Sequence, residues 1–181
     1  MAVYRPTTGI WYLRQSSAGD TAVAFGTDGD VPVVGDYDGD AKADIGVYRP
    51  STGVWYLRQS SAGDTATAFG TDGDIPTVGD YDGDAKADVA VYRPSTGVWY
   101  LRQSSAGDTA TVFGTDGDVP APADYDGDGK IDLGVFRPST GVWYLRQSTA
   151  GDTTTVFGTD GDVALPLPAA IHQRHFAQPG P

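Results

Sequence analysis

A sequence repeat of 44 residues runs through almost the whole chain and limits the folds that it can adopt. The segment Val-Tyr-Arg-Pro begins at Val3, Val47 and Val91, and it returns with Phe in place of Tyr at Val135. Residues 47–90 and 91–134 differ at only nine positions. Repeats of about 40 to 50 residues are typical of β-propeller blades, each of which holds four strands. The repeat therefore predicts an array of equivalent units.

Turn residues divide each repeat into four short segments that are rich in β-branched and aromatic residues. Within one repeat we expect strands at residues 31–35, 45–49, 54–59 and 65–69. In the third strand, apolar residues occupy both the odd and the even positions, as in a sheet that is covered on both faces. The predicted fold class is all-β: a β-propeller of four-stranded antiparallel blades, with about 44 residues per blade and about four blades per chain.

The repeat units divide the chain into one array over residues 1–168 and a C-terminal tail over residues 169–181. The units run over residues 3–46, 47–90, 91–134 and 135–168, and the last is incomplete. The array opens on a second strand, and residues 162–168 align with a first strand. This C-terminal segment is expected to complete the first blade beside residues 2–5, which would leave no open sheet edge. Closure within one chain and a larger ring made by a homodimer both remain open.

The charge of the chain narrows the range of partners. All 24 acidic residues are Asp, and the formal net charge is −12. A nucleic-acid partner is not expected, because phosphate binding needs a basic surface. The sequence has no cysteine, no apolar run long enough for a membrane helix, and no signal-peptide core at its start. We therefore expect no membrane insertion. Bound cations would offset the mutual repulsion of so many carboxylates.

The strongest motif is an Asp-rich loop of nine residues that occurs three times. Its carboxylates stand at loop positions one, three, five and nine, and a lysine at position seven offers its backbone carbonyl. The predicted metal ligands are Asp36, Asp38, Asp40, Lys42 and Asp44; Asp80, Asp82, Asp84, Lys86 and Asp88; and Asp124, Asp126, Asp128, Lys130 and Asp132. Ca²⁺ accepts six to eight oxygen ligands, so four carboxylates, a carbonyl and water suffice. We expect about three Ca²⁺ ions per chain.

A plain Asp-Gly turn that needs no metal is the alternative for each loop. Three copies in the same register favour the metal site over that alternative. Without a cation, the clustered carboxylates would repel one another, so the loops should be disordered or the carboxyl pKa values raised.

The loop, the aliphatic strand after it and the segment Arg-Pro-Ser-Thr-Gly-Val-Trp-Tyr together resemble the FG-GAP or VCBS-type repeat of integrin-α-like β-propellers. The resemblance covers residues 2–168. It implies calcium in the loop between the first and second strands, a role in adhesion or ligand recognition, and an extracellular or cell-surface location. Ala41 and Ala85 depart from the glycine usual at loop position six, which Gly129 keeps, and this departure is expected to strain the turn or to weaken metal binding.

Other repeated residues carry weaker signals. Each repeat has a Trp followed by Tyr, at Trp11, Trp55, Trp99 and Trp143. These rings could stack on sugars, but large aromatic residues in a blade more often pack in the core. The repeated Arg at positions 14, 58, 102 and 146 is expected to pair with turn Asp residues or to cover aromatic rings. The segment Gly26–Asp30 and its copies are interpreted as turns between blades.

His172 and His175 lie in the tail, where two ligands are too few for a zinc site of their own. The repeats contain neither His nor Cys, so no Ser-His-Asp or Cys-His set can be drawn from them. The sequence thus predicts no enzyme but a calcium-binding interaction or adhesion module with an unknown protein or glycan ligand. A lectin with repeated sugar sites and an amplified or designed repeat scaffold are the alternatives.

Overall fold

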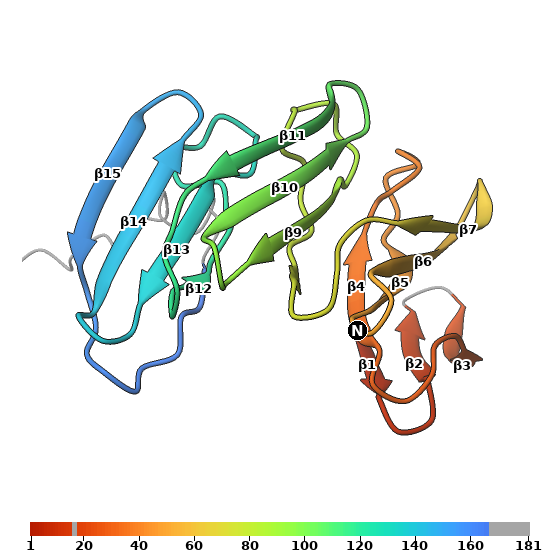
Figure 1. The fold of residues 1–181 in the computed structure, drawn as a ribbon. Coiled ribbons are helices and arrows are strands. Elements are labelled where there is room, and N and C mark those ends of the chain that lie inside the picture. Colours follow the sequence, from red (N-terminus) through yellow and green to blue (C-terminus); the bar gives the residue numbers. More distant parts are fainter. Residues whose placement is uncertain (16–17, 167–181) are drawn as a thin grey trace, which may run out of the picture.

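The computed structural model describes residues 1–15 and 18–166. These residues form fifteen strands and no helix, so none of them builds a helix that could cross a membrane. The strands make four separate antiparallel sheets that follow one another along the chain (Figure 1). The predicted all-β architecture of about four repeated, blade-like sheets is confirmed at this level.

The first sheet has three strands and the others have four. The first holds β1 (Ala2–Arg5), β2 (Ile10–Gln15) and β3 (Gly19–Ala24). The second holds β4 (Val31–Gly35), β5 (Asp44–Arg49), β6 (Val54–Gln59) and β7 (Gly63–Ala68). The third holds β8 (Ile75–Pro76), β9 (Val89–Arg93), β10 (Val98–Gln103) and β11 (Gly107–Val112). The fourth holds β12 (Val119–Pro120), β13 (Leu133–Arg137), β14 (Val142–Gln147) and β15 (Gly151–Val156).

Each sheet is a meander in which sequential strands are neighbours, so the turn chemistry of the repeat fixes the register. The turn between β5 and β6 illustrates this: the Arg49 carbonyl accepts hydrogen bonds from Thr52 N and Gly53 N. Gly53 has a φ of +66°, and a Cβ there would lie 2.1 Å from the Gly70 carbonyl oxygen. Only glycine satisfies both constraints, which explains why this position is glycine in every repeat.

The core lies inside and between the sheets. Trp55 on β6 stacks beside Tyr48 on β5, with ring centroids 5.3 Å apart, and both are fully buried. Val89 and Val91 of the third sheet belong to the same apolar cluster, so neighbouring sheets share one core. Burial of both faces of these strands agrees with the periodicity of the sequence.

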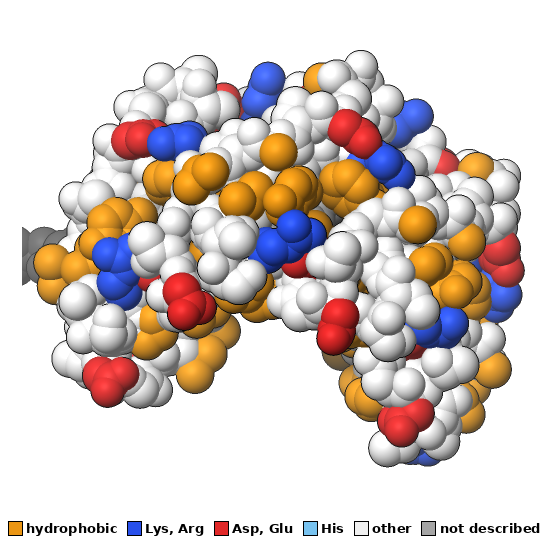
Figure 2. Space-filling view, viewed as in Figure 1, with side chains coloured by type: hydrophobic (Ala, Val, Ile, Leu, Met, Phe, Trp, Pro, Cys, Tyr) orange, Lys and Arg blue, Asp and Glu red, His pale blue; other side chains and the backbone are white. Residues whose placement is uncertain are grey.

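The four sheets are arranged as an arch, with the first and last sheets at its two ends (Figures 1 and 2). Residues 162–166 have no strand assignment, and β1 has no neighbour on its outer side among the described residues. The predicted pairing of the C-terminal segment beside residues 2–5 is therefore not formed within the described part of this chain. The C-terminal tail over residues 169–181, with His172 and His175, lies outside the described residues.

Candidate metal centre

Three Asp-rich loops join the first and second strands of the second, third and fourth sheets. They run from Asp36 to Asp44, from Asp80 to Asp88 and from Asp124 to Asp132. The loop therefore lies where the repeat pattern places it, between β4 and β5 and at the equivalent positions after β8 and β12.

The first carboxylate of each loop organises the backbone of the loop. Asp36 Oδ1 accepts hydrogen bonds from Gly39 N at 2.7 Å and Asp40 N at 3.1 Å, and Oδ2 accepts one from Ala41 N at 2.7 Å. Asp80 makes the same three bonds in the second loop. A short polar side chain that binds backbone N–H groups a few residues ahead stabilises a tight turn. The loop is consequently shaped by its own Asp residues.

Position six of the loop requires a left-handed backbone conformation. The φ angle is +64° at Ala41, +68° at Ala85 and +93° at Gly129. Non-glycine residues in this region cost conformational free energy. The predicted strain of the two alanine loops is present in the structure.

The ninth residue is a buried carboxylate at the start of the second strand. Asp88 is 1% exposed; its Oδ2 accepts a hydrogen bond from Tyr81 N at 2.8 Å, and its Oδ1 accepts one from Ser104 N at 2.8 Å. Burial raises the pKa of Asp88, although these two hydrogen bonds oppose the rise. Asp132 has the same partners in its repeat, and burial likewise raises its pKa.

The carboxylates at positions three and five bind the turn between the third and fourth strands of the same sheet. Asp38 Oδ2 accepts hydrogen bonds from Ser61 Oγ at 2.7 Å, Ser61 N at 2.8 Å and Ala62 N at 3.0 Å. Ser60 Oγ donates to Asp40 Oδ2 at 2.5 Å. The residues that carry this contact are Ser60, Ser61 and Ala62; Ser104, Ser105 and Ala106; and Ser148, Thr149 and Ala150.

Sequence reasoning missed these turn residues as part of the site. It interpreted them only as a strand connection, although the segment Ser-(Ser/Thr)-Ala-Gly-Asp recurs in every repeat. The spacing within the Asp motif does not reveal a contact with this turn. The same sequence in every copy of a solvent-exposed turn was the one signal that these residues belong to the site.

The hydrogen bonds from the turn change the expected electrostatics of the loop. The side chain of Ser61, followed by its backbone N–H, lowers the pKa of Asp38 to about 2. The side chain of Thr149 likewise lowers the pKa of Asp126. The expectation that these carboxyl groups would have raised pKa values is wrong for these positions and holds for Asp88 and Asp132, where burial dominates.

Carboxylate oxygens converge in all three loops. One oxygen from each of three Asp residues lies within 4.8 Å of the others: Asp36, Asp38 and Asp40; Asp80, Asp82 and Asp88; and Asp124, Asp126 and Asp132. Each group could hold a metal ion, and its all-oxygen donor set suits a hard cation. The structure brings together three of the four predicted carboxylates in each loop.

The remaining predicted ligands are not part of these groups. Asp44, Asp84 and Asp128 are not among the three converging carboxylates of their loops. The Lys42 ammonium pairs with Asp40 at 2.8 Å. The roles of the Lys42, Lys86 and Lys130 carbonyls stay predictions.

The repeated Trp residues lie in the core. Trp11, Trp55 and Trp99 are at most 2% exposed, and Trp143 is half-buried. Trp55 Nε1 donates a hydrogen bond to the Phe69 carbonyl at 2.9 Å. The three buried rings offer no face to a sugar, so the structure favours the core interpretation over sugar stacking.

The sequence matches no protein-family model, and no curated protein is significantly similar to it in sequence. The assignment of function therefore depends on the site geometry and on the repeat.

Proposed function

We propose that the chain is a calcium-binding β-propeller-type repeat module that acts in interaction or adhesion and not as an enzyme. The observation that carries the proposal is the convergence of three carboxylates in each of three equivalent loops. A hard cation with flexible coordination fits these oxygen donors, and Ca²⁺ meets that description better than Mg²⁺, which demands stricter octahedral geometry.

The ion would act as a structural tie. Each loop joins two strands and also holds the turn after the third strand of the same sheet, so a cation bound by Asp82 and Asp88 would link three strands. Metal binding to the folded state alone stabilises that state. The Asp clusters occur in three equivalent copies, and hydrogen bonds within the loops and metal binding already account for them. Catalysis by these clusters is therefore not proposed.

The repeat is the observation that supports the wider biological role in this proposal. Equivalent sheets present equivalent outer surfaces, which suits binding of a repetitive protein or glycan ligand through avidity. The plentiful calcium outside cells suits an extracellular or cell-surface setting. Both statements extend the resemblance to integrin-α-like repeats.

Calorimetry on chelator-treated protein tests the proposal. We expect binding of about three Ca²⁺ per chain and a rise in the melting temperature on adding Ca²⁺ that Mg²⁺ does not match. Asp82→Asn should remove about one ion. Asp116→Asn is the matched control, because Asp116 is exposed in a turn outside the three loops and the serine turns that bind them. Absence of bound Ca²⁺ together with an unchanged melting temperature would overturn the proposal.

A glycan-array screen separates the remaining alternatives. Binding that survives removal of calcium and depends on an exposed surface would favour a lectin. Calcium binding without any glycan or protein ligand would favour the amplified or designed scaffold.

A further inference from the structure

The contact between successive sheets has one recurring pattern. Val91 and Tyr100 of the third sheet pack in the cluster that contains Tyr48 and Trp55 of the second. Val135 and Tyr144 of the fourth sheet pack in the same way against Tyr92 and Trp99 of the third. Each sheet thus presents a leading face, with a Val and a Tyr, to the aromatic trailing face of the sheet before it.

An arginine and a phenylalanine complete each of these contacts. Arg58, Arg102 and Arg146 lie over Phe25, Phe69 and Phe113 of the preceding sheet, at 4.5 Å from each ring centroid. A guanidinium over an aromatic face is an attractive contact. In the described part of the chain, Arg14 does not lie over a phenylalanine ring, and no guanidinium lies over Phe157.

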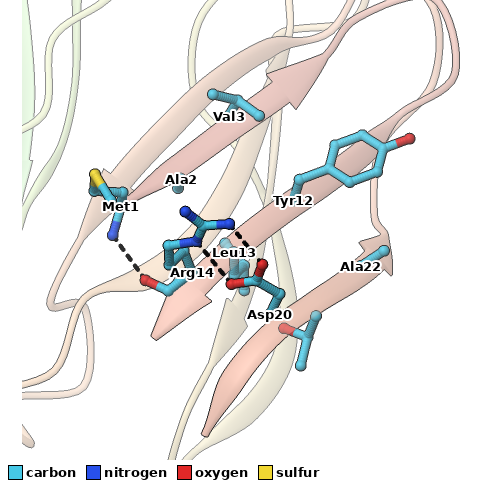
Figure 3. Close-up of a pocket in the computed structure, with 9 residues that line it drawn as sticks. Met1, Ala2, Val3, Tyr12, Leu13, Arg14, Asp20 and Ala22 are labelled. Carbon is cyan, nitrogen blue, oxygen red and sulfur yellow. Dashed lines mark hydrogen bonds and ion pairs between the residues drawn. The ribbon is translucent and has the colours of Figure 1, made fainter. Parts of the chain in front are cut away.

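The leading face of the first sheet is uncovered. Val3 is 65% exposed, whereas its counterparts Val47, Val91 and Val135 are at most 1% exposed. Val3, Tyr12 and Arg14 line a mainly apolar hollow of about 480 Å³, together with Met1, Leu13 and Ala22 (Figure 3).

The trailing face of the fourth sheet is uncovered in a complementary way. Phe157 is 77% exposed, although its counterparts in the other sheets are half-buried under arginine. A second hollow of about 270 Å³ is lined by Phe157, Trp143, Leu145, Tyr125 and Thr155, together with Leu165 and Pro166 from the segment after the last strand. The lining of the two hollows corresponds to the two faces that meet between successive sheets, and the sheets that carry them, β1–β3 and β12–β15, lie at opposite ends of the arch (Figure 1).

The missing strand of the first sheet has a matching segment. In each complete sheet, an Asp immediately before the first strand pairs with the Arg that ends the second strand: Asp30 with Arg49, Asp74 with Arg93 and Asp118 with Arg137. The corresponding residues at the two ends of the array are Asp162 and Arg5. Asp162 is exposed, and its Oδ2 accepts a hydrogen bond from Thr159 N at 2.8 Å, as the turn Asp does in the other sheets. It is therefore already oriented by its turn.

We propose that the uncovered ends bind a second copy of this chain, head to tail. Residues 163–166 of one copy add to the outer edge of β1 of the other, with Val163 opposite Tyr4 and Ala164 opposite Val3, as Val31 and Pro32 lie opposite Tyr48 and Val47. Asp162 of one copy pairs with Arg5 of the other, and Arg14 covers Phe157 across the same interface.

The charge complementarity of Asp162 and Arg5, the apolar lining of both hollows and the strand register favour a copy of this chain as the occupant. Because the first and last sheets lie at the two ends of the arch, the two faces of one chain do not meet in the structure (Figure 2). Two arches joined head to tail through both ends form a closed ring, which leaves no open edge.

A mixing experiment tests this arrangement. Arg5→Asp places two carboxylates at the contact, and Asp162→Arg places two guanidinium groups there, so each variant alone should be a monomer of 18.9 kDa by light scattering in calcium buffer. The unaltered chain should have twice that mass. An equimolar mixture of the two variants should recover the doubled mass, because each interface then pairs Asp with Arg.

Asp116→Arg is the matched control, since Asp116 is exposed in a turn away from both ends and the charge change is the same as in Asp162→Arg. This control should remain a dimer. Far-ultraviolet circular dichroism verifies that each variant is folded. The proposal is overturned if the unaltered chain is a monomer, or if the mixture of the two variants stays monomeric. A monomeric unaltered chain whose β1 amide hydrogens are protected from exchange would mean that the ring closes within one chain. The calcium measurements above do not depend on this outcome.

Discussion

The guanidinium of Arg93 donates two hydrogen bonds to the carboxylate of Asp74: Nε lies 2.7 Å from Oδ1, and Nη2 lies 2.9 Å from Oδ2. The Asp74 side chain is fully buried, and that of Arg93 is 27% exposed. The same Arg93 lies over the Tyr100 ring at 4.5 Å. The pair joins the entry of the first strand to the end of the second, and it recurs in all three complete sheets.

Asp74→Ala should therefore destabilise the protein strongly, because it leaves a guanidinium without its partner at a largely buried position. We expect a loss of about 3 kcal/mol in the free energy of unfolding, measured by urea denaturation. Asp108→Ala removes the carboxylate from an exposed pair with Arg102 and should cost less than about 1 kcal/mol. Equal losses in the two variants would contradict this account of the buried pair.

Replacing the strained loop alanines should stabilise the fold. Ala41→Gly and Ala85→Gly each relieve a left-handed residue, with an expected gain of about 0.5–1 kcal/mol after the entropy of the unfolded chain is counted. Gly129→Ala should have the opposite effect. A Cβ at Gly129 would meet no atom within 4 Å, so any loss there reports backbone conformation rather than a clash. Thermal denaturation with and without calcium measures all three variants.

The acid stability of the loops should depend on the turn serine. Since Ser61 lowers the pKa of Asp38 to about 2, Asp38 contributes stability above its unfolded pKa of about 4, and this contribution is lost as the pH falls toward 2. Ser61→Ala should raise the Asp38 pKa toward 4 in a carboxyl NMR titration of chelator-treated protein. Ser51→Ala, at an exposed turn without contact to the loop, should leave that pKa unchanged.

The core tryptophans should contribute to stability and not to ligand binding. Trp55→Ala empties a fully buried site and should cost about 3–5 kcal/mol. Trp55→Phe keeps most of the ring but leaves the Phe69 carbonyl without its Nε1 donor, and should cost about 1–2 kcal/mol. Urea denaturation gives both values. A large loss of sugar binding in folded Trp55→Phe would instead support the lectin alternative.

Much of the fold follows from local sequence. The β5, β6 and β7 segments lie within two residues of the predicted bounds, because Thr-Gly and Ala-Gly-Asp turns fix the strand ends. The first strands of the third and fourth sheets differ more from the predicted five residues. β8 and β12 have two residues each, and each is followed by an isolated bridge, at Gly79 and Ala123. Pro32 occupies the same position in the five-residue β4, so the difference lies in the residues that follow the proline: Val33-Val34 in β4, but Thr77-Val78 and Ala121-Pro122 after β8 and β12.

The candidate site was predictable in part. Spacing alone placed the Asp residues in the loops after β4, β8 and β12, because they recur in register with the strands. Spacing did not indicate which three carboxylates converge, or that Ser61 and its counterparts bind them from a turn that follows more than 20 residues later. Contacts of that kind depend on the hairpin that brings the turn back beside the loop.

The sequence by itself determined the period, the strand order and the Asp loops, because each depends on residues close together in the chain. Only the tertiary structure decided how the repeats meet: that Val91 is buried by the neighbouring sheet while Val3 is not, and that Arg58 covers Phe25 while Phe157 stays exposed. Near-identical repeats carry the same local information, so their different burial comes from position in the arch, where the inner sheets have neighbours on both faces and the outer two have one.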